Sequence, residues 1–172
     1  MELLERFALG DLEAFETLFR QFQGQVYRWI VRIVRDPGAA EDLTIETFWR
    51  VYRARARFDP ARDFGAWARR IASNVALDHL KKVPREVGLS ENWPREASRD
   101  AVAQREVSQA IQHAFCALPA KLRAVATLAL IEETPYPVIA EALGISVEAV
   151  KTRKFRAVRL LRKKLKRLGV EP

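Results

Sequence analysis

A run of lysines and arginines near the C-terminus contains the residues with the clearest chemistry. No acidic residue interrupts it between Glu148 and Glu171. Guanidinium and ammonium groups bind phosphates and base edges, so this run suits a polyanion. Its basic members are Lys151, Arg153, Lys154, Arg156, Arg159, Arg162, Lys163, Lys164, Lys166 and Arg167. An apolar stripe at helical spacing (Val150, Phe155, Val158, Leu161, Leu165) favours a nucleic-acid-binding helix over a solvated basic tail.

The surrounding segment, residues 134–166, predicts a helix-turn-helix. A short helix spans Val138–Leu143, and Gly144 provides the permissive backbone that a tight turn requires. Ser146 is placed to cap a long helix that ends near Leu165. A small core between these helices is expected from Ile139, Ala140, Leu143, Ile145 and Val150.

Two carboxylates, Asp42 and Glu46, are spaced four residues apart on a helix predicted from about Ala39 to Arg57. No histidine or third carboxylate shares their face, and the chain has no Gly-rich phosphate loop, Gly-x-Ser-x-Gly or HExxH motif. We therefore expect no catalytic residue, metal or cofactor. Acidic residues mixed with exposed apolar ones on this helix instead favour a protein-binding patch.

Composition narrows the class further. The 172 residues carry a net charge of +8, and most of that excess follows residue 100. The single cysteine, Cys116, excludes an internal disulfide, and two histidines, His79 and His113, do not provide a zinc site. Neither a signal peptide nor an apolar stretch long enough to cross a bilayer is present, so we expect a cytoplasmic protein without membrane insertion.

The predicted fold class is all-α, in two small helical domains joined by a flexible linker. Residues 1–83 form the first domain, 84–100 the Pro-containing linker, and 101–172 the second domain with the helix-turn-helix. The second domain also contains helices predicted over Ala101–Ala117 and Ala120–Ile131.

The first domain is predicted to contain a short helix over Leu3–Ala8 and a long one capped by Asp11 that ends at Asp36-Pro37-Gly38. A further helix spans Phe64–Lys82, with Trp67 on its core side. On its outer side lie Asn74, whose amide can read a base edge, and the cations Arg70 and Lys81, which can hold phosphate.

Four segments, in order, resemble the extracytoplasmic-function sigma factors of bacterial RNA polymerase, within the sigma-70 family. GDLEAFETLFRQF resembles their opening helix, and DPGAAEDLTIETFWRVYRA their polymerase-binding helix. FGAWARRIASNVALDHLKK resembles the promoter-melting helix. ALPAKLRAVATLALIEE, followed by IAEALGISVEAVKTRKFRAVRLLRKKL, resembles the fourth sigma region.

This resemblance implies a promoter-specificity subunit, with residues 1–83 as sigma region 2 and 101–172 as region 4. Asn74 would read a flipped minus-ten base, with the loop of residues 58–65 helping to form its pocket. The minus-thirty-five element would be met by Lys151, Thr152, Arg153, Phe155 and Arg156. The face around Asp42, Leu43, Glu46 and Phe48 would dock on core RNA polymerase. The partners so implied are core RNA polymerase, promoter DNA and an anti-sigma factor.

Two positions depart from the family pattern. Ile45 stands where the family usually has glutamine. The sequence Thr134-Pro135-Tyr136-Pro137 replaces the usual opening of the first helix of the helix-turn-helix, which we expect to begin near Pro137. The alternatives are a stand-alone helix-turn-helix repressor or activator that never binds polymerase, and a metal-dependent nucleic-acid enzyme.

Overall fold

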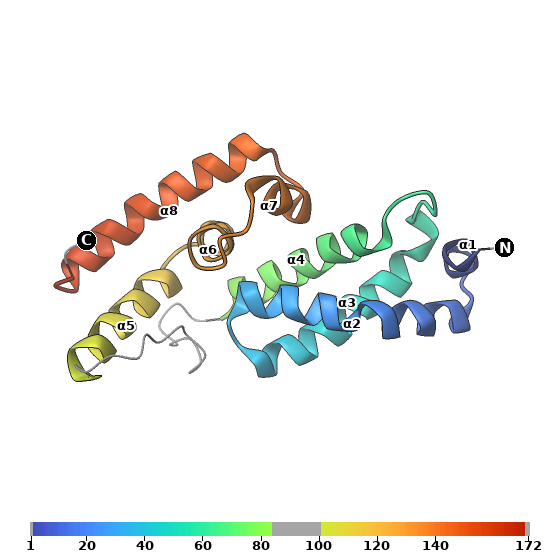
Figure 1. The fold of residues 1–172 in the computed structure, drawn as a ribbon, viewed down its shortest axis with the longest axis horizontal. Helices are drawn as coiled ribbons and strands as arrows, with labels where there is room; N and C mark the ends of the chain where they lie inside the picture. The colour runs from blue at the N-terminus through green and yellow to red at the C-terminus, as the bar shows by residue number, and fades with distance from the viewer. Residues whose placement is uncertain (1, 84–100, 171–172) are drawn as a thin grey trace.

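The computed structural model describes residues 2–83 and 101–170, and every regular element in those ranges is helical, as predicted (Figure 1). The elements are α1 (Leu3–Ala8), α2 (Leu12–Val34), α3 (Pro37–Ala54), the 3₁₀ turn η1 (Arg55–Arg57), α4 (Phe64–Lys82), α5 (Ala101–Cys116), α6 (Ala120–Ala126), the π-helical turn η2 (Thr127–Ile131), α7 (Tyr136–Leu143) and α8 (Val147–Arg167). The predicted linker, residues 84–100, lies outside the described residues.

Aspartate caps set the starts of the three long N-terminal helices. The Asp11 carboxylate accepts hydrogen bonds from the backbone N–H groups of Glu13 and Ala14, at 2.9 and 3.1 Å. Asp36 and Asp63 cap α3 and α4 in the same way. The backbone N–H groups of the first helical turn have no acceptor within the helix, and these carboxylates accept their hydrogen bonds. Each aspartate therefore marks the residue at which its helix begins.

An aromatic cluster joins α1 to the start of α4. The ring of Phe7, fully buried, lies 5.5 Å from that of Phe64, and the rings of Phe58 and Trp67 are 4.8 Å apart. Trp67 therefore packs with the core, as its position on the apolar stripe predicted. Because Phe58 and Phe64 bracket the loop between α3 and α4, the cluster also holds the two ends of that loop.

The helix-turn-helix has the geometry that its turn residues predict. Gly144 has a φ of 65°, in the left-handed region that favours glycine, and the Ser146 hydroxyl accepts a 3.1 Å hydrogen bond from the N–H of Ala149. The helix α7 begins at Tyr136, one residue earlier than the start expected near Pro137. Pro137 fits the first turn because the N–H that it lacks would have no helical acceptor there.

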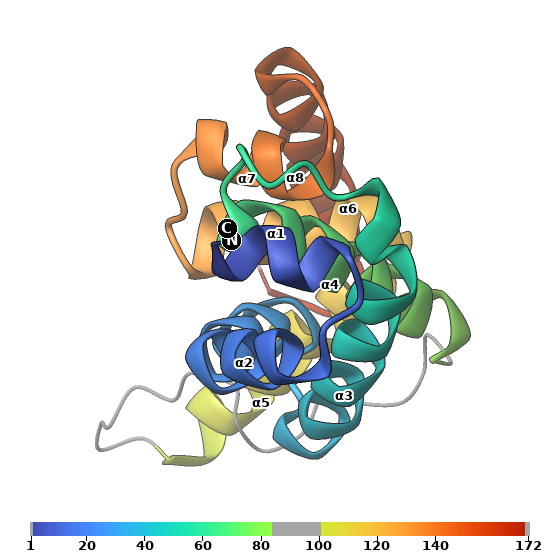
Figure 2. The same cartoon turned by 90° about the vertical axis from the view of Figure 1, so that its right-hand side faces the viewer.

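The two halves pack against each other rather than standing apart. One apolar cluster extends from Ile30 and Ala72, in α2 and α4, to Val125, Leu128 and Ile139 in the C-terminal half. Figures 1 and 2 show α7 lying between α4 and the start of α8, and α6 beside α4. A second cluster, around Ala126, Ala157 and Leu161, holds α5, α6 and α8 together. The domain arrangement, which the sequence left open, is closed in this structure.

Candidate nucleic-acid and partner-binding surfaces

The first turns of α8 present the predicted minus-thirty-five residues to solvent. Lys151, Thr152 and Arg156 are exposed, Arg153 is half-buried, and the Phe155 side chain is 68% exposed. The opposite face of the helix buries Val150, Ala157 and Leu161. The Phe155 side chain therefore lies on the exposed side of α8, with its neighbouring cations, and does not belong to the buried apolar stripe.

Two polar contacts orient this basic face. The Lys154 ammonium donates a 2.6 Å hydrogen bond to the Tyr136 hydroxyl, which ties α8 to the start of α7. The Lys151 ammonium donates to the Glu148 carboxylate at 2.9 Å, and this bond raises the pKa of Lys151. Lys151 therefore stays charged at neutral pH. The contact from Lys154 was not predicted, because it depends on the angle between α7 and α8.

The helix α4 carries the predicted minus-ten residues at positions 70, 74 and 81, a spacing that places them along one side of the helix. Asn74 and Lys81 are exposed, and neither lies in the apolar core. Arg70 is also exposed, but its guanidinium lies over the turn of the helix-turn-helix. A Cβ atom built on Gly144 would approach Nη2 of Arg70 to 2.8 Å, so the two groups pack closely.

The predicted polymerase-binding face on α3 is only partly as expected. Asp42 is exposed, Leu43 is half-buried, and Glu46 accepts a 2.8 Å hydrogen bond from Arg50. Phe48 is only 2% exposed and packs against Phe19, so its side chain is not available to a partner in this structure. The helical phase explains the difference, because Thr44, Thr47, Phe48 and Val51 all point into the core.

The exposed apolar residues of α3 are instead Ile45 and Trp49, at 67% and 57% exposure. They border a groove of about 370 Å³, whose other lining residues are Leu12, Phe15, Phe19, Phe48 and Tyr52. Leu12 lies on the apolar stripe of α2 in the sequence, yet it is 66% exposed. It occupies the first residue of the helix, beyond the end of the core.

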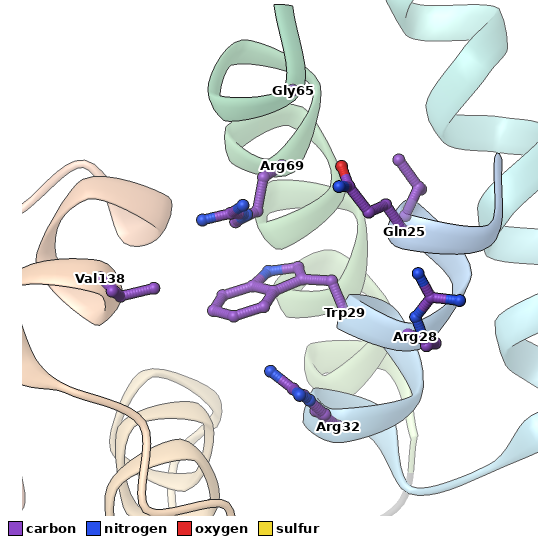
Figure 3. Close-up of a pocket in the computed structure, with 8 residues that line it drawn as sticks. Gln25, Arg28, Trp29, Arg32, Gly65, Arg69 and Val138 are labelled. Carbon is purple, nitrogen blue, oxygen red and sulfur yellow. The ribbon is translucent and has the colours of Figure 1, made fainter. Parts of the chain in front are cut away.

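A second cleft, of about 260 Å³, lies where α7 meets α2 and α4 (Figure 3). Its lining residues are Gln25, Val26, Arg28, Trp29, Arg32, Gly65, Arg69 and Val138. The Arg69 guanidinium carbon lies 5.4 Å from the centre of the Trp29 ring, a cation–π contact. In Figure 3, Arg69 and Arg32 flank the indole, and Val138 faces it from α7. Sequence reasoning did not find this cleft, since it forms only between the two halves.

The described ranges, 2–83 and 101–170, contain no group of three or more histidine, cysteine, aspartate or glutamate residues that could hold a metal ion. Within the same ranges no helix has both the length and the apolar character needed to cross a bilayer.

These features define a class: an all-helical protein with a helix-turn-helix, an exposed basic face on α8, and a separate face of α3 that carries acidic and exposed apolar residues. Sequence comparison agrees. The family described as sigma-70 region 2 matches residues 18–86, and sigma-70 region 4 matches residues 108–161.

Relatives extend the match over nearly the whole chain. The ECF RNA polymerase sigma factor SigW of Bacillus subtilis is 33% identical, over 92% of this chain and 92% of its own. BldN of Streptomyces coelicolor, another ECF RNA polymerase sigma factor, is 34% identical over 94% of this chain, which spans 64% of BldN. The chain therefore belongs to the sigma-70 family, in its extracytoplasmic-function group, and is a promoter-recognition sigma factor for RNA polymerase.

Solved structures show the same fold. CnrH, in a complex with the cytosolic domain of CnrY, is 26% identical with a TM-score of 0.55, and the match covers 95% of both chains. The sigma factor RpoE of Bartonella quintana, in a complex with the anti-sigma factor NepR, is 20% identical with a TM-score of 0.55, over 88% of this chain and 96% of its own.

Proposed function

We propose that this chain initiates transcription by bringing core RNA polymerase to promoters that it reads at two elements, without catalysis of its own and within the cytoplasm. Residues 1–83 would act as region 2, residues 84–100 as the connection, and residues 101–172 as region 4. The observation that carries this proposal is the exposed face of α8, from Lys151 to Arg156, on a helix capped by Ser146 and braced by α7.

The minus-thirty-five element is read by this face. A recognition helix enters the major groove with its N-terminal residues toward the bases, and Ser146 begins such a helix here. Lys151, Arg153 and Arg156 donate to guanine or to phosphate, and Phe155 contacts a thymine methyl. Thr152, which is exposed between them, donates to a base or to the backbone.

The minus-ten element is read by α4. Asn74 recognises a base flipped from the duplex, and Lys81 and Arg70 hold the strand through its phosphates. Unstacking a base costs a few kcal/mol, so a pocket that compensates this cost for one base makes strand opening sequence-selective. The aromatic cluster supports this assignment because it holds the ends of the loop that precedes α4.

Core polymerase binds the exposed side of α3. Asp42, Glu46 and the accessible part of Leu43 contribute, and Ile45 and Trp49 add the apolar centre that tight interfaces require. Phe48 supports this surface from the core beneath it. An anti-sigma protein is a further expected partner, since the sigma factor RpoE of Bartonella quintana has been solved with the anti-sigma factor NepR, and CnrH with the cytosolic domain of CnrY.

Reconstituted transcription tests this function. The purified chain should co-purify with core polymerase and direct initiation at promoters that neither component uses alone. Arg156→Ala should weaken promoters with an intact upstream element, whereas Asn74→Ala should lose the preference for one minus-ten base. Arg105→Ala, which removes an exposed arginine from α5, is the matched control. Tight binding to duplex operator with no polymerase complex would support the stand-alone repressor instead.

A further inference from the structure

The carboxylate of Glu132 joins the two halves of the molecule. Oε1 accepts a hydrogen bond from Nη1 of Arg35, and Oε2 lies 3.6 Å from Nε of Arg32. Arg32 lies in the last turn of α2 and Arg35 is the C-cap that follows it, whereas Glu132 follows η2 in the C-terminal half. The side chains of Glu132 and Arg35 are 21% and 11% exposed, so their attraction is screened less than that of a surface ion pair.

The ion pairs of Glu132 with Arg32 and Arg35 are the ones that the described residues form across this boundary. Val138 of α7 faces the indole of Trp29 across the cleft in Figure 3, and Arg70 of α4 lies on the backbone at Gly144. Neither contact depends on a unique side-chain pairing. Glu132 therefore provides the ion pairs of an interface that otherwise rests on the shared apolar core, and reversing its charge would place like charges together at this boundary.

The closed arrangement conflicts with the proposed reading of DNA, on which this inference depends. While Arg70 lies against the helix-turn-helix turn, the Nε and Nη2 edge of its guanidinium faces Gly144 and is not presented to a phosphate beside Asn74. In addition, α4 and the start of α8 are held close together by α7, so the two reading faces cannot reach separate promoter elements.

We propose that Glu132, through Arg32 and Arg35, acts as a latch that keeps the free protein closed, and that the latch must open before the two promoter elements are bound together. A protein whose competent state is only partly populated binds with an affinity reduced by that fraction. Weakening the latch therefore tightens binding to core polymerase and promoter.

Glu132→Arg tests the latch because it places a third guanidinium between Arg32 and Arg35. Spin labels at Gln23→Cys in α2 and Arg162→Cys in α8, both exposed, report the separation of the halves in a Cys116→Ala background. Glu133→Arg is the matched control: Glu133 is adjacent, exposed, and has no ion pair among the described residues. The parent should give one narrow distance distribution, and Glu132→Arg a broader and longer one.

Adding Arg32→Glu to Glu132→Arg restores an ion pair with reversed charges and should narrow the distribution again. Circular dichroism keeps the interpretation clear, since helical content should not change if the halves separate while each stays folded. Identical distributions for Glu132→Arg and Glu133→Arg would overturn the latch. So would a broad distribution in Glu132→Arg that the second substitution does not reverse.

The functional measurement uses the full chain with core polymerase and promoter DNA. Glu132→Arg should increase the apparent affinity about fivefold, the size expected for one coupled charge pair, and Glu133→Arg should leave it unchanged. If no variant binds polymerase, the proposed function is wrong, but the spin-label distances still show whether Glu132 keeps the two halves together. If polymerase binds and the distances do not respond to Glu132→Arg, only the latch fails.

Discussion

The indole Nε1 of Trp29 donates a 2.8 Å hydrogen bond to the hydroxyl of Ser73, which joins α2 to α4 inside the core. Ser73 is fully buried and in turn donates to the carbonyl of Arg69 at 2.9 Å. The same indole forms part of the cleft that receives Val138. This buried polar contact thus joins the indole that lines the cleft to α4, the helix with the proposed minus-ten residues.

Ser73→Ala should therefore destabilise the protein by about 1–3 kcal/mol, because the Trp29 N–H would remain buried without an acceptor. Urea unfolding followed by circular dichroism measures this change. Asn74→Ala, at the exposed neighbouring position, should change stability by less than about 0.5 kcal/mol. Equal stabilities for the two variants would show that water replaces the Ser73 hydroxyl.

Trp49→Ala should weaken polymerase binding and Phe48→Ala should lower stability, although the two residues are adjacent. Trp49 is exposed, so its truncation should weaken core polymerase binding about tenfold and leave stability nearly unchanged. Phe48 is buried, so its truncation should cost about 3–5 kcal/mol of stability. Fluorescence titration with polymerase and urea unfolding separate the two effects.

Leu160→Ala, an exposed apolar position on α8, controls for loss of surface area. Normal polymerase affinity in Trp49→Ala would remove this residue from the interface.

Phe155→Ala should weaken promoters that depend on the minus-thirty-five element about tenfold, which corresponds to the loss of one base contact. Because the side chain is largely exposed, the melting temperature should hardly move. Transcription from matched promoters, with and without the thymine contacted, gives the measurement. Leu160→Ala serves here as the control on the same helix. A large loss of stability in Phe155→Ala would mean that the ring packs inward in solution.

Acidification should weaken the contact between α4 and α6 through His79. Burial lowers the pKa of His79, and the nearby charges of Arg123 and Lys82 lower it further, while Asp36 opposes them. The folded protein thus favours neutral imidazole. Its contribution to stability is complete above the ordinary histidine pKa, near 6.5, and is lost as the pH falls from there through the lower folded value.

Urea unfolding between pH 8 and 5 measures this dependence. His79→Gln should flatten the decrease in stability below about pH 6.5, and His113→Gln, at an exposed position, should retain it. An NMR titration of the His79 ring gives the folded pKa directly. A value at or above 6.5 would contradict the expected direction.

The sequence predicted the helices and turns well because helix caps and tight turns depend on short stretches of sequence. The caps at Asp11 and Ser146 and the turn at Gly144 depend on a few neighbouring residues, and each is found as expected. The prediction of the polymerase-binding face on α3 was less accurate. It placed Phe48 on the surface, and apolar residues lie on more than one side of this helix, so the sequence alone does not show which side faces the core. Ile45 and Trp49 are identified as exposed only when the partners of α3 are known.

The sequence by itself determined an all-helical chain with a basic helix-turn-helix at its C-terminal end, since helical periodicity, capping residues and charge are properties of short segments. Only the tertiary structure decided that the two halves share a core, that Glu132 meets Arg32 and Arg35, and that Arg70 rests on Gly144. Those contacts join residues far apart in the chain. They depend on side-chain packing and on the angles between helices, which no local pattern specifies.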